Sequence, residues 1–224
     1  MQLSERLQCV ADLVTPGMVP ADIGTDHGYV PIALVKRGTA PYAYAMDYRE
    51  GPLLRAEEHI RAEGLTEKIA TRLSDGFDNL KKGEAQTAIL AGMGGPLVVD
   101  ILKRGKDVIS DMDSLILSPQ SRICDVRQYI LTAGYHIERE KCVYEGGKYY
   151  FVIKMIPREE DTSVWEKADL LFGKYLIETR DPVLKSFLLK EKALYEALLE
   201  GPAGESVKEK LAPVLRALER MDRS

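Results

Sequence analysis

Asp22, Asp47 and Asp75 are the residues whose type and spacing first indicate a ligand site in this chain. Each stands at or just beyond the end of a short apolar run that is typical of a buried strand. In open α/β sheets, ligands bind beyond the carboxyl ends of the strands, so we expect these carboxylates to gather there. They can offset positive charge, accept ribose hydroxyl protons and meet an adenine amino group. Aspartate also favours helix caps and turns, and that alternative stays open for each residue taken singly.

A glycine loop directly follows the first of these runs. It reads Asp22-Ile-Gly24-Thr25-Asp-His-Gly28, and its glycines let the backbone approach a ligand closely. The spacing D-x-G-x-x-x-G differs from the G-x-G-x-x-G fingerprint that binds the pyrophosphate of a dinucleotide. It suits a cofactor that has a sulfonium and an amino acid group but no phosphate. The loop and the three aspartates together predict a site for S-adenosyl-L-methionine.

The elements that must position these residues alternate between strand and helix as far as residue 134. Short links join them, which is typical of a parallel sheet covered on both faces. Two strand-like runs around the turn 145–147 then indicate a hairpin. The expected fold is therefore α/β, with a doubly wound sheet that ends in an antiparallel pair. Strands are expected at 18–23, 42–46, 69–73, 86–91, 114–117, 136–144 and 148–156, and helices near 3–14 and at 29–37, 51–63, 96–102 and 124–132.

A strand-free tail rich in Leu, Lys and Glu follows a polar break at 157–161. Leucines at helical spacing predict two or three antiparallel helices over 164–178, 182–199 and 206–221, interrupted at Gly201-Pro-Ala-Gly204. We therefore expect two domains, residues 1–157 with the sheet and residues 158–224 with a helical hairpin.

The composition is that of an ordinary globular protein with 224 residues and a formal net charge of −4. This charge argues against non-specific coating of nucleic acid, although it leaves room for local basic patches. No apolar run approaches the ~20 residues of a membrane span, and the N-terminus has no signal core, so we expect a cytoplasmic protein. Three separated cysteines and three scattered histidines predict neither a disulfide framework nor a metal site. The sequence leaves the oligomeric state open, with a monomer favoured.

Two motifs stand out in the sequence, A-D-I-G-T-D-H-G-Y-V-P at 21–31 and I-L-A-G-M-G-G at 89–95. Through these motifs the chain resembles a known family, the bacterial tRNA (adenine-22-N1)-methyltransferases. Gly51-Pro52-Leu53, Asp75-Gly76 and the N-terminal Leu-Ser-Glu-Arg-Leu at 3–7 fit as well. The corner Ser118-Pro119-Gln120 stands where the family usually has Gln-Pro-Asn. The likeness covers nearly the whole chain.

The resemblance implies a Rossmann-like methyltransferase sheet of seven strands with a coiled-coil-like helical appendage at the C-terminus. It implies that a methyl group passes from S-adenosyl-L-methionine to N1 of an adenosine in the D-arm region of tRNA. Asp47 would hold the ribose, and Asp75 with Gly76 would flank the adenine. The residues that would bind the cofactor are Asp22, Gly24, Thr25, Gly28, Asp47, Asp75, Gly76, Gly92 and Met93.

The implied reaction needs no strong general base, because N1 of adenine carries a lone pair and no proton at neutral pH. The enzyme must unstack the base, align N1 with the methyl group and exclude water. A carboxylate would stabilise the charge that develops on the ring, and Asp26 is the hypothesis for this role. His27 would accept a proton or orient the ring, and Tyr29 would stack on it. The alternatives are a helix cap for Asp26 and a structural hydrogen bond for His27.

Several other assignments remain open from the sequence. The chain could methylate a small molecule or a protein, could be a nicotinamide-dependent oxidoreductase that lacks the third glycine, or could be a non-catalytic RNA-binding module. Met93 is as readily a core residue as a cofactor contact. Phosphates of RNA could meet basic residues, which are Lys81, Lys82, Lys103, Arg104, Lys106, Arg122, Arg127, Lys174, Arg180, Lys185, Lys190 and Lys192.

Overall fold

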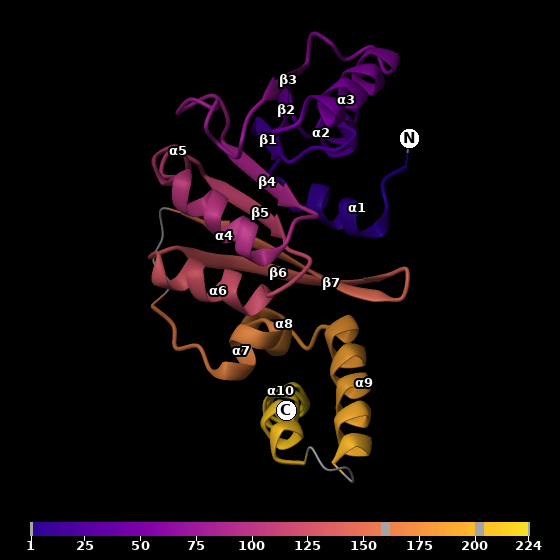
Figure 1. The fold of residues 1–224 in the computed structure, drawn as a ribbon, viewed down its shortest axis with the longest axis vertical. Coiled ribbons are helices and arrows are strands. Elements are labelled where there is room, and N and C mark those ends of the chain that lie inside the picture. The colour runs from indigo at the N-terminus through magenta and orange to yellow at the C-terminus, as the bar shows by residue number, and fades with distance from the viewer. Residues whose placement is uncertain (1, 158–161, 200–203, 224) are drawn as a thin grey trace.

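A single seven-stranded sheet forms the centre of the molecule (Figure 1). The computed structural model describes residues 2–157, 162–199 and 204–223. The strand order is β3-β2-β1-β4-β5-β7-β6; the first five strands are parallel, and β7 is antiparallel to both neighbours. The expected doubly wound sheet that ends in a hairpin is confirmed. The strands are β1 Pro20–Ile23, β2 Ala43–Asp47, β3 Ile69–Leu73, β4 Thr87–Ala91, β5 Ser114–Ser118, β6 His136–Glu145 and β7 Lys148–Ile156.

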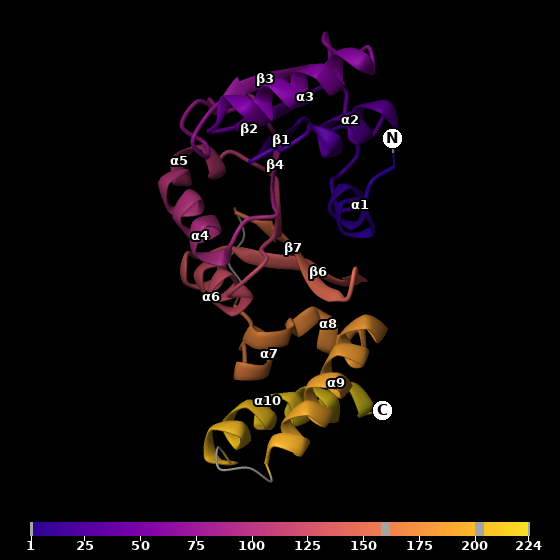
Figure 2. The same ribbon diagram turned by 45° about the vertical axis from the view of Figure 1, so that its right-hand side comes forward.

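Helices cover both faces of this sheet (Figures 1 and 2). One buried cluster lies between the sheet and α1, α2 and α3, and a second lies between the sheet and α4, α5 and α6. The central strands β1 and β5 are buried along their whole length, which explains why they read as continuous apolar runs. The helices are α1 Glu5–Asp12, α2 Tyr29–Lys36, α3 Glu50–Ala62, α4 Gly95–Arg104, α5 Lys106–Ile109 and α6 Ile123–Thr132.

The C-terminal tail is helical, as expected, but its first helix is interrupted. The expected helix over 164–178 is two helices, α7 Lys167–Phe172 and α8 Lys174–Glu178, separated by Gly173 with φ +96°. A Cβ at Gly173 would lie 2.7 Å from Oε2 of Glu140, so this backbone passes close to the sheet domain. The single-helix prediction was wrong because a buried carboxylate of another element requires the break.

The long helices α9 Pro182–Leu198 and α10 Gly204–Asp222 lie side by side (Figures 1 and 2). Asp181 caps α9 by accepting hydrogen bonds from the backbone nitrogens of Val183 and Leu184, both at 2.9 Å. The two helices share a third buried cluster with Cys142 and Phe151 of the terminal hairpin. The coiled-coil likeness of the pair stays a prediction, and residues 201–203 of the expected break lie outside the described residues.

A buried ion pair joins the sheet to the tail. Arg127 of α6 and Glu140 of β6 have fully buried side chains, and Nε of Arg127 donates to Oε1 of Glu140 at 2.7 Å. Nη1 of Arg127 also donates to the carbonyls of Leu170 and Leu171 in α7. Burial raises the pKa of Glu140, and the guanidinium opposes this shift. The expectation that Arg127 meets RNA was wrong, because its side chain is buried and its guanidinium already binds Glu140 and two backbone carbonyls.

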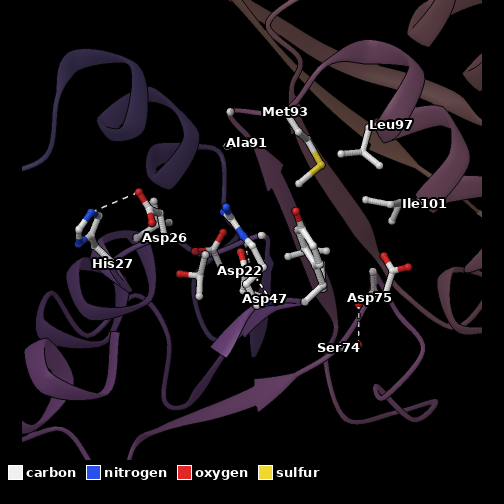
Figure 3. A pocket seen from close by; sticks show the side chains of 18 of the residues that line it. Asp22, Asp26, His27, Asp47, Ser74, Asp75, Ala91, Met93, Leu97 and Ile101 are labelled. Carbon is white, nitrogen blue, oxygen red and sulfur yellow. Dashed lines mark hydrogen bonds and ion pairs between the residues drawn. The ribbon is translucent and has the colours of Figure 1, made fainter. Parts of the chain in front are cut away.

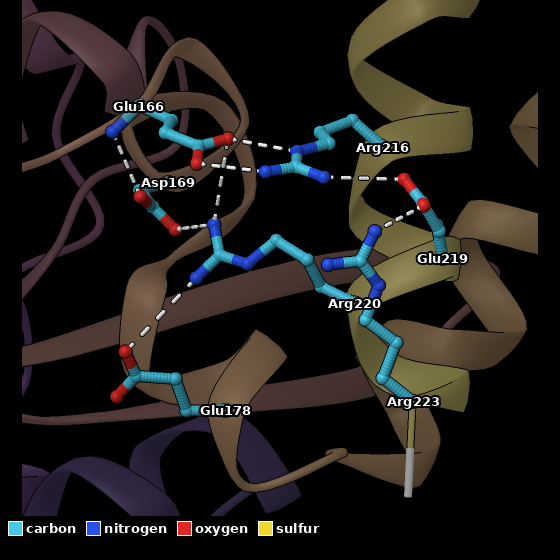
Figure 4. A network of polar contacts seen from close by, with 7 residues as sticks. All are labelled: Glu166, Asp169, Glu178, Arg216, Glu219, Arg220 and Arg223. Atoms are coloured by element: carbon cyan, nitrogen blue, oxygen red, sulfur yellow. Dashed lines mark hydrogen bonds and ion pairs between the residues drawn. The ribbon is translucent and has the colours of Figure 1, made fainter.

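A second polar network fixes α10 against α7 (Figure 4). Nη1 of Arg220 lies 2.6 Å from Oδ1 of the buried Asp169, and its other nitrogen lies 4.0 Å from Glu178. Arg216 forms two contacts of 3.0 Å with the carboxylate of Glu166, and these side chains are 39% and 45% exposed. Because the tail shares contacts with β6, β7 and α6, the boundary at residue 157 stays a prediction.

Trp165, the one tryptophan of the sequence, lies at the junction between sheet and tail. Its half-buried ring packs against the sheet cluster beside α4–α6 and lies 6.3 Å from the ring of Tyr175. Within the described ranges, no helix is long and apolar enough to cross a membrane. Over the same ranges, no group of His, Cys, Asp or Glu side chains could hold a metal ion.

Candidate functional site

A cavity of about 840 Å³ opens at the carboxyl ends of β1, β2, β3 and β4 (Figure 3). Asp22 and Asp47 lie in its middle, and Asp75, Leu97 and Ile101 lie toward one end. The strand ends meet here because β1 pairs in parallel with both β2 and β4. The three aspartates predicted from the sequence therefore line one cavity.

Asp22 and Asp47 are the buried carboxylates of the cavity, with exposed fractions of 7% and 4%. Burial raises the pKa of Asp22 to about 6, and the charge of the neighbouring Asp47 acts in the same direction. No arginine or lysine of the described chain forms an ion pair with it. A carboxylate in this state favours a ligand that brings its own positive charge.

Asp47 is the last residue of β2, and the turn that follows holds its side chain in place. Its Oδ1 accepts a hydrogen bond of 2.8 Å from the backbone nitrogen of Arg49, and Nε of Arg49 lies 3.6 Å away. Asp47 therefore stabilises the turn after β2, which is the structural role that the sequence left open for it. It also lines the cavity, so the second carboxylate oxygen can serve a ligand hydroxyl. The two roles coexist.

Asp75 and Gly76 lie at the end of the cavity that α4 covers. Oδ1 of Asp75 accepts a hydrogen bond of 3.0 Å from Arg104, and this arginine also pairs with Asp78 and Asp100. Gly76 has φ +60°, and a Cβ there would lie 3.0 Å from the side chain of Ile101. With Leu97 on the same helix, this end is an apolar slot with a carboxylate at its edge, which suits a planar heterocycle.

The start of the loop after β1 brings its backbone close to the cavity. Gly24 and Thr25 line the cavity, and their backbone nitrogens donate to the carbonyl of Met46 at 2.7 and 2.8 Å. Gly24 has φ +78°, which a residue with a side chain rarely adopts. Gly28 does not line the cavity; it caps α2 in the left-handed region and packs against Ala56 of α3.

The glycine loop after β4 forms the facing wall. Gly92 and Met93 line the cavity, and a Cβ at Gly24 would lie 2.6 Å from Cε of Met93. Met93 also packs against the buried cluster beside α4–α6, so it is both a core residue and a cavity residue. The loop is held by Gly95, whose nitrogen donates to the carbonyl of Ser121 at 3.0 Å.

Asp26, His27 and Tyr29 also line the cavity, with Asp26 and His27 toward the end opposite Asp75 (Figure 3). Oδ1 of Asp26 lies 2.6 Å from Nη2 of Arg55, and Oδ2 lies 3.2 Å from Nε2 of His27. The hydrogen bond from Arg55 lowers the pKa of Asp26, which keeps this exposed carboxylate ionised. Gly28 rather than Asp26 is the cap residue of α2, so the capping alternative for Asp26 does not hold.

Three rings stack beside this carboxylate. The centroid of His27 lies 4.9 Å from that of Tyr29 and 5.5 Å from that of His59, and the latter two lie 5.3 Å apart. Nδ1 of His59 lies 3.0 Å from the carbonyl oxygen of His27, which ties α3 to the loop after β1. His59 lies 32 residues further along the chain, and no sequence pattern connects it with this group.

Several cavity residues were not predicted as site residues. Some follow the ends of β2 and β3 directly, and the others come from β1, β4, α1, α2, α4 and the turn after β5. Arg104 was expected only among the residues that could meet RNA phosphates, because its pairing with Asp75 depends on how α4 packs against the turn after β3. Arg6 lies in the Leu-Ser-Glu-Arg-Leu stretch, to which the sequence alone assigned no role. The set comprises Arg6, Leu7, Ile23, Val30, Tyr48, Arg49, Ser74, Ala91, Leu97, Asp100, Ile101, Arg104 and Gln120.

The sheet order, the antiparallel β7 and the carboxylates at three successive strand ends define a methyltransferase of the Rossmann-like class. A family model described as a methyltransferase domain matches residues 3–153. The tRNA (adenine(22)-N(1))-methyltransferase of Bacillus subtilis is 33% identical, and the alignment covers 98% of this chain and 95% of that protein. The chain belongs to the family of bacterial tRNA (adenine-22-N1)-methyltransferases, as its motifs indicated.

Solved structures of similar proteins have the same architecture. A Streptococcus pneumoniae protein in complex with S-adenosyl-L-methionine is 32% identical, with a TM-score of 0.88 over 97% of this chain and all of that one. M. capricolum TrmK in complex with S-adenosyl-homocysteine is 26% identical, with a TM-score of 0.86 over 99% of this chain and all of that one. The expected seven-stranded fold with helices at the C-terminus is thus confirmed over the described residues.

Proposed function

We propose that this chain transfers a methyl group from S-adenosyl-L-methionine to N1 of the adenosine at position 22 of tRNA. The similarity to the Bacillus subtilis enzyme over almost the whole of both chains supports the substrate and the position. The observation that carries the cofactor assignment is the buried Asp22 in a cavity that Asp47 and Asp75 also line. With tRNA as the substrate, the reaction takes place in the cytoplasm.

The residues of the cavity fit this cofactor. Asp47 presents a carboxylate where ribose hydroxyls would lie, and Asp75 with Gly76 borders the apolar slot for adenine. Asp22 balances the positive charge of the sulfonium and ammonium groups. The backbone at Gly24, Thr25 and Gly92 can approach the cofactor closely. The side chain of Met93 lies along the middle of the cavity. The cofactor supplies an electrophilic methyl group, and Gly28 contributes by shaping the loop.

We assign the chemistry to the end of the cavity that Asp26, His27 and Tyr29 line. N1 attacks with its own lone pair, so the protein has to hold the base in line and stabilise the charge that develops. Asp26 is ionised beside Arg55 and would stabilise that charge. The planes of His27 and Tyr29 differ by 10°, and they offer a surface on which an unstacked adenine can lie.

Contacts to the rest of the tRNA require exposed cations near this cavity. Arg122 lies two residues after Gln120 of the cavity wall; its side chain is 68% exposed, and its Nε lies 2.5 Å from Oδ2 of Asp125. Lys103 on α4 and Lys81 with Lys82, in the link between β3 and β4, are also exposed, but none of the three lines the cavity. Phosphate contacts of this kind give affinity and a steep dependence on salt, rather than sequence recognition.

The proposal is tested by incubating the protein with labelled S-adenosyl-L-methionine and unmodified bacterial tRNA, followed by mass spectrometry of the nucleosides. The expected product is N1-methyladenosine at position 22, and a tRNA with another base at position 22 is the matched control substrate. Equal methylation of the control would contradict the position. Cofactor binding without any transfer to tRNA would redirect the substrate assignment to a small molecule or a protein.

A further inference from the structure

The first turn of α1 is built to hold Arg6 at the cavity wall. Oγ of Ser4 caps this helix by accepting a hydrogen bond of 3.3 Å from the backbone nitrogen of Leu7. The backbone nitrogen of Glu5 donates to Oε1 of Glu145 at 2.6 Å, which ties the helix start to the terminal hairpin. Leu3 and Leu7 pack against the cluster beneath α1. The Leu-Ser-Glu-Arg-Leu stretch therefore fixes the backbone position from which the side chain of Arg6 extends.

The guanidinium of Arg6 is held in place without an acid partner. Its central carbon lies 5.4 Å from the ring centroid of Tyr150 on β7, a cation–π contact. Its Nη1 lies 4.0 Å from the position that a Cβ on Gly92 would occupy. This nitrogen is buried, and it has no hydrogen-bond acceptor among the described residues. A buried donor without an acceptor is costly, and a ligand oxygen would remove that cost.

The other arginines that line the cavity are already neutralised. Arg49 lies beside Asp47, and Arg104 pairs with Asp75, Asp78 and Asp100. Within the described part of the chain, Arg6 is thus the cavity arginine whose charge no carboxylate balances. The cavity offers a positive site for one anionic group.

The sheet order places this positive site away from the adenine slot. Reading from β3 to β4 along the sheet, the cavity residues are Asp75, Asp47, Asp22 and Gly92. The cofactor has the same order of groups, which is adenine, ribose, sulfonium and amino acid. Asp22 faces the cationic centres, and Arg6 lies beside Gly92, where the amino acid ends.

We infer that Arg6 binds the carboxylate of the amino acid end of S-adenosyl-L-methionine, an inference that rests on the proposed function. The free nitrogen is buried beside the loop after β4, where a small carboxylate can reach it after a slight rotation of the guanidinium. A phosphate of tRNA has the same anionic oxygens, but it is attached to a bulky chain outside the cavity. The carboxylate is therefore the occupant that the burial favours.

Two ligands that differ in this group test the inference. S-adenosylhomocysteine carries the amino acid end, whereas 5′-methylthioadenosine has the same adenine and ribose without it. Titration calorimetry of the full chain would compare wild type, Arg6→Met, Arg6→Lys and the control Arg37→Met. Arg37 contacts Asp12 and Gln8 of α1 from outside the cavity, so it reports any loosening of the helix.

The expected result is that Arg6→Met weakens binding of S-adenosylhomocysteine by about tenfold to a hundredfold, the usual loss for one charge-assisted hydrogen bond. Binding of 5′-methylthioadenosine changes less than about twofold, which also shows that the cavity is intact. Arg6→Lys retains part of the affinity, and Arg37→Met changes neither ligand.

Three results would overturn the inference. Equal losses for both ligands would mean that Arg6 only shapes the cavity. Unchanged affinity for S-adenosylhomocysteine with a raised KM for tRNA would assign Arg6 to a phosphate instead. If the wild-type protein bound neither ligand, the proposed function itself would fail, and this outcome is distinct because it appears before any variant is made.

Discussion

Asp22 is the residue whose ionisation couples the cavity to pH. Its carboxylate is buried, and its pKa of about 6 means that it is charged at pH 7.5 and largely neutral at pH 5. A pKa raised above the unfolded value means that the charged carboxylate destabilises the ligand-free fold. The contribution of Asp22 to stability therefore improves as pH falls through 6. A cationic ligand needs the charged carboxylate, so affinity changes in the opposite direction.

We therefore predict that affinity for S-adenosylhomocysteine falls as pH is lowered from 7.5 to 5, with a slope approaching about tenfold per pH unit below the pKa of Asp22. Asp22→Asn is expected to bind more weakly at pH 7.5 and to lose this dependence. Calorimetry of both proteins across the pH range measures the effect. An identical slope in the variant would show that another group titrates.

Asp26 gives a second prediction for a single residue. Asp26→Asn is expected to lower kcat for tRNA methylation by about a hundredfold, because the developing charge loses its carboxylate. The carboxylate is exposed and is paired with Arg55 and His27, so affinity for S-adenosylhomocysteine is expected to change less than about twofold. Single-turnover transfer to a tRNA transcript checks the rate. Unchanged turnover would remove Asp26 from the mechanism and leave it as a partner of Arg55.

At the scale of elements, the turn from β4 into α4 depends on Gly95. A Cβ there would overlap the carbonyl oxygen of Ser121 and lie 2.9 Å from that of Arg122, and both belong to the backbone. We predict that Gly95→Ala lowers the free energy of unfolding by roughly 1–3 kcal/mol and weakens cofactor binding through the shifted loop. Urea denaturation measures the first effect and calorimetry the second.

Gly51 is the matched control for this prediction. It lies in the first turn of α3, and the nearest atom to an added Cβ is the end of Arg55 at 3.8 Å. Gly51→Ala is expected to be neutral or to stabilise the protein by up to about 1 kcal/mol, because alanine favours a helix. If both variants lost stability equally, crowding at Ser121 would not be the cause.

Much of the fold could be predicted from the sequence because the strands are buried runs between clear turn signals. The hairpin turn could be predicted because Gly-Gly is typical of two-residue turns with positive φ. Gly146 and Gly147 both adopt positive φ in the structure. The break at Gly173 and the short α5 could not be predicted from the sequence, because they depend on tertiary contacts. The order of the last two strands has no local signature either.

The same reasoning applies to the candidate site. The strand-end aspartates could be found because their positions follow from the alternation of strands and helices. Arg6 and His59 reach the site from helices whose packing fixes their distance to it. A single sequence carries no signal for such contacts, and only the assembled sheet brings them together.

At the scale of the whole molecule, the attachment of α10 depends on one buried contact more than on the exposed ones. We predict that Arg220→Met lowers the free energy of unfolding by roughly 3 kcal/mol, because Asp169 would remain buried without its partner. Arg216→Met removes exposed contacts to Glu166, and its effect is expected to be clearly smaller. Thermal unfolding of the two variants compares them directly. Equal losses would contradict the importance of burial.

Trp165 gives this junction an intrinsic optical reporter. As the one tryptophan of the chain, it dominates fluorescence excited at the red edge of protein absorption, so no label is needed. Its ring is wedged between the sheet cluster and Tyr175, so emission shifts to longer wavelength when the tail leaves the sheet and water enters. Circular dichroism follows the helices of the whole chain in the same sample. Coincident transitions would mean that tail and sheet unfold as one cooperative unit, whereas an earlier change in emission would mean that the tail detaches from a sheet that is still folded.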